Sequence, residues 1–332
     1  MGAKRMRVLV TGGAGYIGSV IAEELLQAGH QVVAFDNLSR GHRQAVPKNA
    51  ELVVGDTSDR ACLDQLFQSR AIDAVMHFAA LIEAGESMKA PEEFFHNNTS
   101  NALTLLEAML AARVKRFVFS STAALYGNPK RIPIEEDDPL LPTNAYGESK
   151  LLVERMLAWF HQIHGLHYAS LRYFNAAGAY RPDKGEAHQP ETHLIPRVLQ
   201  VALGRAQHAN IFGTDYPTPD GTCVRDYIHV GDLARAHLLA LQALESSSPL
   251  IYNLGNGQGF SVRQVVEVAR SVTGHPLPVI ESPRRAGDPA VLIASSEKIR
   301  RDLGWQPRFP DLKSIVESAW QWHRTHPDGY LG

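Results

Sequence analysis

The chain has 332 residues, of which 44% are hydrophobic and 20% are charged, and its net charge is −2. This composition fits one large α/β unit or a main domain with a smaller lobe, and it excludes a broadly basic surface for nucleic acid or an anionic membrane. The two cysteines, Cys62 and Cys223, lack disulfide or metal-ligand spacing, and the sequence contains no run of about 18 apolar residues. We therefore expect a cytoplasmic protein without a signal peptide or a membrane span.

The first half of the chain alternates short β-branched runs with helical patterns, which is typical of a parallel α/β sheet. The runs are often apolar throughout, as expected when helices cover both faces of the sheet. Strands are predicted at 8–10, 32–35, 51–54, 74–77, 117–120 and 168–172, with a return to the sheet around 250–254. Helices are predicted at 19–28, 63–68, 101–111 and 149–161. The predicted fold class is α/β, a Rossmann-type doubly wound parallel sheet with a smaller C-terminal lobe.

The pattern changes from about Tyr180 onward, where proline and glycine become frequent and the alternation of strands and helices weakens. Such a composition predicts a loop-rich lobe. We accordingly divide the chain into a first domain, residues 1–178, and a lobe, residues 179–332. The lobe is expected mainly to bind the substrate and to return some segments to the main sheet.

A strand that runs into glycines and then a helix lies near the start of the chain. Gly12, Gly15 and Gly18 permit a tight turn and let a pyrophosphate approach the backbone, and the helix N-terminus offers N–H groups to it. The alternative is a turn that needs glycine for steric reasons alone. Asp36 ends the next strand, where a carboxylate can accept from both hydroxyls of an adenosine ribose and repel a 2′-phosphate. We therefore predict that the first domain binds NAD rather than NADP.

Gly55-Asp56-Thr57 follows the third predicted strand. At this position the Asp56 carboxylate can accept a hydrogen bond from the adenine amino group. The alternative is that Asp56 is the N-cap of the helix that follows. The sequence leaves both interpretations open.

Tyr146 and Lys150 are four residues apart and therefore lie on one face of a predicted helix. An ammonium group beside a phenol lowers the pKa of the phenol from about 10 toward neutrality, so that Tyr146 can act as a general base on a sugar hydroxyl. The alternative is an ordinary surface pair. Small hydroxyl residues at the end of the strand before this helix point into the ligand cleft of an α/β sheet. Thr122 is predicted to hydrogen-bond the reacting oxygen, whereas Ser120 and Ser121 are assigned to local structure.

These motifs resemble the extended short-chain dehydrogenase/reductase superfamily, as do His77-Phe78-Ala79-Ala80, Asn97-Asn98 and the run at 121–127. The blocks at 171–179, 211–230 and 283–288, and the closing Trp320-Gln321-Trp322-His323, resemble the UDP-glucose 4-epimerase family over nearly the whole chain. The resemblance implies NAD that is reduced and re-oxidised within one turnover, with UDP-galactose and UDP-glucose as substrates. By this resemblance Tyr146 takes the proton of the sugar 4-hydroxyl, Lys150 tunes Tyr146 and bonds the nicotinamide ribose, and Thr122 bridges the sugar and Tyr146.

The resemblance also implies the remaining site residues. For NAD the set is Gly12, Gly15, Tyr16, Ile17, Gly18, Asp36, Asn37, Leu38, Ser39, Arg40, Gly41, Asp56, Thr57, Phe78, Ala79, Ala80, Asn98 and Phe174, with Thr122, Tyr146 and Lys150. For the nucleotide sugar the set is Asn175, His193, Leu194, Phe212, Arg225, Tyr227, Arg285, Asp288 and Leu292, with Thr122 and Tyr146. The guanidinium forks of Arg225 and Arg285 suit a diphosphate, although surface arginines are the alternative.

Two further implications concern substrate breadth and assembly. Leu292 stands where the family places a residue that limits the pocket around the sugar's C2 substituent, so a leucine in place of a large aromatic implies room for an N-acetyl group. The alternative is that Leu292 packs under the lobe. In the family that the chain resembles, two helices of each subunit form a four-helix contact, so the resemblance implies a homodimer through the helices at 101–111 and 149–161. Its candidate contacts are Leu105, Met109, Leu152, Met156 and Trp159, with core packing as the alternative for most of them.

Several other functions compete with this one. Ala123 and Ala124 stand where the related 4,6-dehydratases carry an Asp-Glu pair, so elimination of water lacks its proton carriers. Another UDP-sugar 4-epimerase, acting on UDP-N-acetylglucosamine or UDP-glucuronate, an NAD(P)-dependent sugar-nucleotide reductase and a non-catalytic NAD-sensing protein stay open. His193 departs from family members that carry asparagine there. The other histidines show no pair at metal spacing with a carboxylate partner, so we expect no metal.

Overall fold

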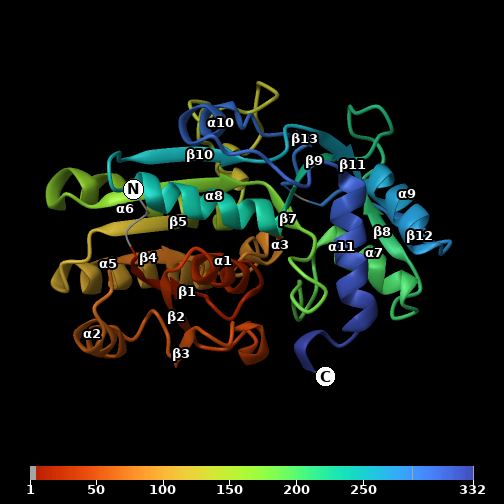
Figure 1. Ribbon diagram of the computed structural model, residues 1–332. Helices are drawn as coiled ribbons and strands as arrows, with labels where there is room; N and C mark the ends of the chain where they lie inside the picture. Colours follow the sequence, from red (N-terminus) through yellow and green to blue (C-terminus); the bar gives the residue numbers. More distant parts are fainter. Residues whose placement is uncertain (1–4, 286, 332) are drawn as a thin grey trace. The chain divides into compact units, whose positions relative to one another are not determined.

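The computed structural model describes residues 5–285 and 287–331, and the chain forms two compact units (Figure 1). The first unit comprises Met1–Leu125, Leu140–Arg172 and Ala234–Tyr252. The second comprises Tyr126–Pro139, Tyr173–Leu233 and Asn253–Gly332. Among the described residues, no helix combines the length and the apolar character that crossing a bilayer requires.

The first unit is built on a seven-stranded, mostly parallel sheet with the strand order β10-β6-β5-β4-β1-β2-β3. The strands are β1 (Arg7–Thr11), β2 (Gln31–Asp36), β3 (Glu51–Val54), β4 (Ala74–His77), β5 (Arg116–Thr122), β6 (His167–Tyr173) and β10 (Leu250–Leu254). Each predicted strand is present, including the return near residue 250, and the Rossmann-type α/β fold is confirmed. The strand order reverses at β1, which pairs in parallel with both β2 and β4. In this fold, ligands bind outside the carboxyl ends of the strands at such a point.

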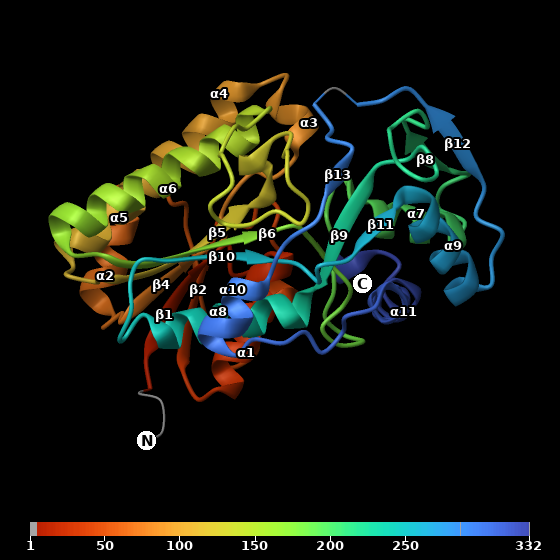
Figure 2. The same cartoon turned by 90° about the horizontal axis from the view of Figure 1, so that it is seen from above.

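Helices cover both faces of this sheet (Figure 2). On one face lie α1 (Tyr16–Gln27) and α8 (Val230–Ala243), and on the other α2 (Arg60–Ser69), α5 (Asn101–Ala111) and α6 (Ala145–His164). The short helices α3 (Ala84–Ser87) and α4 (Pro91–Phe94) and a π-helical turn (Phe95–Ser100) lead into α5. Short 3-10 turns lie at Arg43–Ala45, Ala123–Tyr126 and Gly329–Leu331.

Several of the candidate dimer contacts belong to the hydrophobic core beneath α2, α5 and α6. Leu105 and Met109 are fully buried in it, and Met156 packs against it. The prediction that Leu105 and Met109 face a partner is wrong, because these side chains fill the space between the helices and the sheet. Trp159 of α6, by contrast, is 62% exposed.

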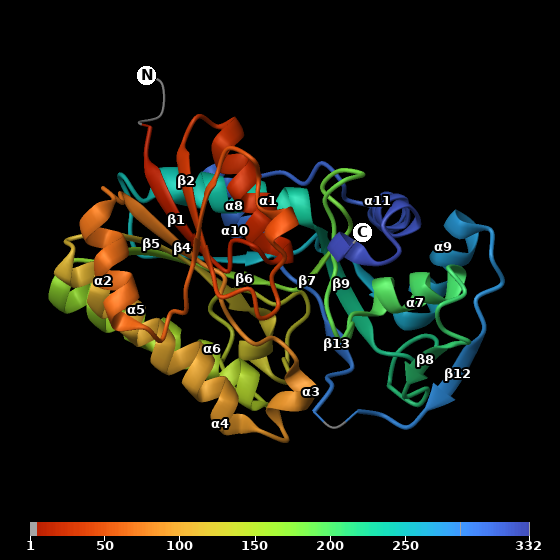
Figure 3. The same ribbon diagram turned by 90° about the horizontal axis from the view of Figure 1, so that it is seen from below.

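The second unit contains two small sheets and a group of packed helices. In the first sheet β9 (Val224–His229) pairs with β11 (Gly259–Ser261), β13 (Val291–Leu292) and β7 (Asn175–Ala177), and in the second β8 (Ala209–Phe212) pairs with β12 (Val279–Ser282) (Figure 3). The helices α7 (Leu194–Ala202), α9 (Val262–Thr273) and α11 (Leu312–Thr325) pack together, and α10 (Glu297–Leu303) follows β13. Their core includes Val198, Val265 and Ile315.

A buried carboxylate fixes the loops around β9. Asp226 is 0% exposed and accepts backbone N–H bonds from Asn256 at 2.8 Å, Gly257 at 3.0 Å and Ala294 at 3.1 Å. Burial raises the pKa of Asp226 to about 7, and the three N–H bonds act against this shift. One side chain therefore joins β9 to two separate loops of the second unit, in addition to the backbone pairing of β9 with its neighbouring strands.

Candidate active site

The glycine turn between β1 and α1 has the geometry of a phosphate cradle. Gly12 has a φ of +69°, and a Cβ there would lie 2.7 Å from the Ala79 nitrogen. A Cβ on Gly18 would lie 2.2 Å from the Gly12 oxygen, so only glycine allows the first turn of α1 to pack on the loop. Tyr16 and Ile17 follow at the start of α1, where helical N–H groups point outward. The turn thus places backbone donors at the carboxyl edge of the sheet.

Asp36 lies at the end of β2, beside this turn. Its carboxylate accepts from the Ala14 N–H at 3.0 Å and from the Leu38 N–H at 2.8 Å. Burial raises the pKa of Asp36, and these two bonds act in the opposite direction. A Cβ on Gly41 would lie 2.8 Å from either carboxylate oxygen, so the loop that carries Asn37, Leu38, Ser39 and Arg40 closes tightly on Asp36.

Asp56 does not cap the helix that follows it. It accepts from Asn37 Nδ2 at 2.6 Å and from the Ser58 N–H at 2.8 Å, whereas the N-cap of α2 is Asp59. The N-cap interpretation is therefore wrong, and Asp56, followed by the buried Thr57, belongs to the same polar group as Asn37.

Asn98 connects the segment after β4 to the helix that carries Tyr146. Its amide accepts from the Leu81 N–H at 2.8 Å and donates to the Leu81 oxygen at 2.9 Å and to Ser149 Oγ at 3.0 Å. Phe78, Ala79 and Ala80 precede Leu81 at the end of β4, next to Gly12. These contacts make Asn98 a positioning residue for α6 and for the loop after β4.

Tyr146 and Thr122 face each other because α6 begins close to the end of β5. Asn144 caps α6 by accepting from the Gly147 N–H at 2.8 Å, and a Cβ on Gly147 would lie 2.7 Å from the Ala124 oxygen. Burial raises the pKa of Tyr146, the hydrogen-bonding Thr122 hydroxyl lowers it in part, and the charge of Glu83 raises it. The predicted lowering of this pKa by the residues of the chain is wrong, because burial is the largest effect on the phenol.

Lys150 is buried one helical turn after Tyr146, and its ammonium group is held by Ser120. Nζ donates to the Ser120 oxygen at 2.9 Å and to Ser120 Oγ at 3.3 Å, and lies 4.9 Å from the centre of the Phe119 ring. Burial lowers the pKa of Lys150 to about 7. Ser120 thus fixes the position of the ammonium group, a role that the sequence did not indicate.

Two further buried residues of the first unit, His77 and Ser121, have defined side-chain partners. Burial, and then the charge of Lys150, lowers the pKa of His77 to about 3, and His77 Nδ1 lies 2.7 Å from Thr11 Oγ1. The structural role predicted for Ser121 is confirmed, since its hydroxyl donates at 2.5 Å to Glu154. Glu154 in turn forms a buried ion pair with Arg172 at 2.6 Å.

Several residues predicted to bind the nucleotide sugar lie on three adjacent strands of the second unit. Asn175 of β7 is in register with Tyr227 of β9, and Leu292 of β13 is in register with Arg225 of β9. Asn175 Nδ2 donates to the backbone oxygen of Asp226 at 2.9 Å. Tyr227 is buried, and burial raises its pKa. The structure therefore brings these four residues together, with Phe174 immediately before β7.

Two arginines of the second unit, Arg225 and Arg285, are each held against a neighbouring side chain. Arg225 is mostly buried, with Nη2 at 3.9 Å from Asp288 Oδ1. The guanidinium of Arg285 stacks 4.0 Å from the centre of the Phe212 ring at the end of β8. Stacking and ion pairing leave a guanidinium in a fixed orientation, which suits recognition of a diphosphate.

His193 and Leu194 lie at the start of α7, where His193 occupies the N-cap position. His193 Nδ1 contacts a carboxylate oxygen of Glu186, and His188 Nδ1 lies 3.0 Å from the same oxygen. The expectation that no histidine pair has a carboxylate partner is therefore wrong. The spacing in Glu186-x-His188-x-x-Glu191-x-His193 matches no helical or paired-ligand template, which is why the sequence pattern did not reveal this cluster.

Comparison with known proteins gives a consistent result. A family model described as the NAD dependent epimerase/dehydratase family matches residues 8–255. A UDP-glucose 4-epimerase of Halalkalibacterium halodurans is 54% identical over 327 residues, which cover 98% of each chain. The solved UDP-glucose 4-epimerase from Brucella ovis in complex with NAD is 45% identical with a TM-score of 0.92, over 95% of this chain and 97% of that one. The solved enzyme from Bifidobacterium longum in complex with NAD+ and UDP is 37% identical with a TM-score of 0.92, over 97% and 99%.

Proposed function

The chain belongs to the NAD-dependent epimerase/dehydratase family, and on this premise we propose that it interconverts UDP-galactose and UDP-glucose with NAD as cofactor. The reaction is a transient oxidation at sugar C4, rotation of the 4-keto sugar and reduction from its other face. The observation that carries the proposal is the pairing of Tyr146 with Thr122 at the carboxyl end of β5, in the unit whose glycine turn suits a pyrophosphate. The chain is accordingly an isomerase.

The residues of the first unit fit NAD. The pyrophosphate would lie on the N–H groups at the start of α1, where a side chain on Gly12 or Gly18 would collide with the backbone. A carboxylate offers about four acceptor positions, so Asp36 can accept from two ribose hydroxyls in addition to its two backbone bonds. Bound NAD supplies the hydride acceptor and donor for C4 and a positive ring charge.

The chemistry proposed for this chain centres on one proton. Tyr146 takes the proton of the sugar 4-hydroxyl and returns it after the 4-keto sugar has rotated, and Thr122 orients the reacting oxygen. Because burial raises the pKa of Tyr146, formation of the phenolate depends on positive charge nearby. Lys150, held by Ser120, supplies part of that charge while it is protonated, and the oxidised cofactor supplies the rest.

The second unit is proposed to hold the nucleotide sugar. Arg225 and Arg285 would bind the diphosphate, with Asn175, Tyr227, Asp288 and the Nε2 atom of His193 completing the polar set. A second substrate class, UDP-N-acetylhexosamines, is favoured by Leu292, because it pairs in register with Arg225 on the adjacent strand and is smaller than an aromatic residue.

We also propose a homodimer through α6 and a cytoplasmic location. Trp159 and Ile163 of α6 are 62% and 64% exposed, and large exposed apolar side chains gathered on one helix are typical of an interface. Sedimentation of the intact protein and of Trp159→Glu at micromolar concentration tests the dimer: a dimer that the substitution dissociates is expected, and a monomer in both cases would contradict it.

Both cysteines are free thiols, which fits the reducing compartment of the proposed cytoplasmic location.

The function is tested by incubating the purified protein with UDP-galactose, without added NAD, and following UDP-glucose with a coupled assay. Steady formation of UDP-glucose is expected, because the cofactor stays bound and is regenerated in each turnover. Turnover that requires added NAD(P)H and gives a reduced product would instead identify a sugar-nucleotide reductase.

A further inference from the structure

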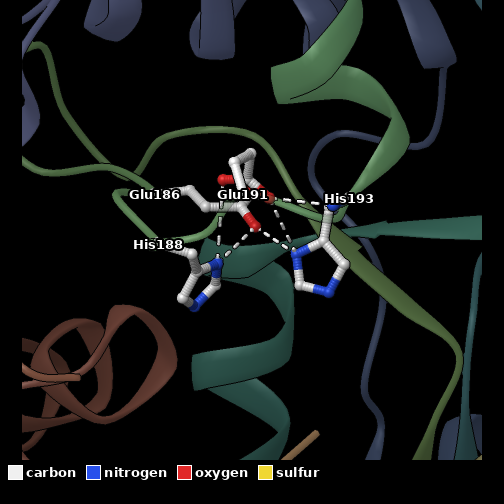
Figure 4. Close-up of side chains that lie close together, drawn as sticks. All are labelled: Glu186, His188, Glu191 and His193. Atoms are coloured by element: carbon white, nitrogen blue, oxygen red, sulfur yellow. Dashed lines mark hydrogen bonds and ion pairs between the residues drawn. The ribbon is translucent and has the colours of Figure 1, made fainter. Parts of the chain in front are cut away.

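A compact group of four side chains lies in the loop before α7 (Figure 4). Glu186, His188, Glu191 and His193 each present one nitrogen or oxygen atom, and these atoms all lie within 4.8 Å of one another. Figure 4 shows both imidazole Nδ1 atoms and the carboxylate oxygens facing a common point. We propose that these four residues form a structural site for one divalent transition-metal ion of the Zn²⁺ type.

The ligand chemistry fits such an ion. Two imidazole nitrogens and two carboxylate oxygens are ligands that zinc accepts in tetrahedral sites. With metal–ligand bonds of about 2.0–2.1 Å, neighbouring ligand atoms in a tetrahedron lie about 3.3–3.4 Å apart. Two pairs of the cluster lie on either side of this value: His188 Nδ1 is 3.0 Å from Glu186 Oε1, and His193 Nδ1 is 3.8 Å from Glu191 Oε1. His193 Nδ1 contacts Glu186 Oε1 more closely and would have to move away from it when an ion enters. Small side-chain rotations would give the tetrahedral spacing.

Charge and burial support the same conclusion. The side chains of Glu186 and Glu191 are only 3% and 6% exposed, yet both face the same point. Buried carboxylates are costly unless they are paired or bind a metal. When all four act as metal ligands, the two carboxylates are deprotonated and the two imidazoles are neutral, so their charge of −2 is balanced by one divalent cation.

Hydrogen bonds and close packing anchor the backbone of this loop. The Trp322 indole donates to the backbone oxygen of Glu186 at 2.8 Å. The Tyr330 hydroxyl accepts from the Gly185 N–H at 3.2 Å and donates to the Gly185 backbone oxygen at 3.1 Å. Gly185 packs so closely on Trp322 that a Cβ there would lie 2.4 Å from its ring. The Glu191 carboxylate accepts from the N–H groups of Thr192 and His193, both at 2.8 Å. Anchored ligands lose little freedom on binding, as metal sites require.

All four proposed ligands come from the protein, which is the arrangement of a structural rather than a catalytic zinc site. The ion would join the two ends of the loop from Glu186 to His193 immediately before α7. Its expected effect is on the stability of the folded protein, because an ion that binds only the folded state stabilises it by mass action.

The test uses the full chain without an affinity tag. Elemental analysis after gel filtration should find close to one zinc per chain. After chelator treatment and removal of the chelator, added Zn²⁺ alone should raise the melting temperature, and Co²⁺ should give the visible absorption of a four-coordinate site. His188→Gln, whose side chain is 22% exposed, should abolish both responses, and so should Glu191→Gln. The matched control His208→Gln, outside the cluster, should retain them.

Two results would overturn the proposal. If the intact chain contains no stoichiometric metal and neither Zn²⁺ nor Co²⁺ changes its melting temperature or absorption, the four side chains form an ion-pair network without a metal. If His188→Gln and Glu191→Gln respond to the ions as the intact chain does, the ions bind elsewhere. A variant that fails to fold would be replaced by His188→Asn, which the same measurements evaluate.

Discussion

The two units hold their functional side chains by different means. In the first unit Asp36 ends β2, Thr122 ends β5 and Tyr146 begins α6, so backbone hydrogen bonds of regular elements set their positions. In the second unit the corresponding residues lie on short strands and loops that particular buried side chains, such as Asp226, hold in place. Every residue except proline can make the backbone bonds of a strand, whereas a side chain without acceptor oxygens cannot replace Asp226. Function and stability should therefore separate in the first unit and be coupled in the second.

The largest effect on function is expected from Tyr146→Phe. The substitution removes the proton acceptor and leaves α6 and its cap unchanged, so turnover should fall roughly 10²–10⁴-fold while the melting temperature and bound NAD are retained. Tyr168→Phe removes a hydroxyl from a buried tyrosine of β6 and should keep most of the activity. If Tyr146→Phe kept more than about a third of wild-type turnover, Tyr146 would not be the base.

The largest effect on stability is expected from Asp226→Ala in the second unit. It leaves three buried backbone N–H groups without their acceptor and should lower the free energy of unfolding by roughly 3–5 kcal/mol. Denaturant titration measures this loss. Asp137→Ala, which removes an exposed partner of Arg131 in the same unit, should cost about 1 kcal/mol or less. Equal losses in the two variants would contradict the anchoring role of Asp226.

A pH dependence of stability is expected from Lys150. Its folded pKa of about 7 lies below the ordinary lysine value of about 10.4, so between these values the unfolded chain binds the proton and the folded chain does not. The free energy of unfolding is therefore highest above pH 10, where Lys150 is neutral in both states. It falls as the pH is lowered toward 7, by about 1.4 kcal/mol per pH unit. Lys150→Met should remove this slope from denaturant titrations, and Lys115→Met, at an exposed lysine, should not. A slope that persists in Lys150→Met would assign it to another group.

The smallest effect is expected from Leu292→Tyr. A larger side chain beside Arg225 should lower kcat/KM for UDP-N-acetylgalactosamine relative to UDP-galactose by about tenfold, or about 1.4 kcal/mol. Leu292→Met, of similar volume, should leave the ratio unchanged. If the intact enzyme gives no detectable turnover of the acetylated sugar, other side chains close the pocket.

The same contrast explains what the sequence could predict. The strands of the main sheet were predictable because apolar runs between glycines and helical patterns reflect local chain preferences. Asp36 and Thr122 were predictable because they end such runs. Three side-chain contacts were not: the link from Ser120 to Lys150, the link from Asn98 to Ser149, and the cluster of Glu186 with His193. They depend on how α6 and the loop before α7 pack, and spacing along the chain carries no signal of this.

The proposed reaction is tested most directly by the fate of the hydrogen at C4. UDP-galactose carrying deuterium at C4 is incubated with the purified protein in ordinary water, without added NAD, and the UDP-glucose formed is analysed by NMR. Because the hydride is returned to the same sugar, the deuterium should be retained at C4 of the product. Loss of the deuterium to solvent, or the absence of UDP-glucose, would contradict the account.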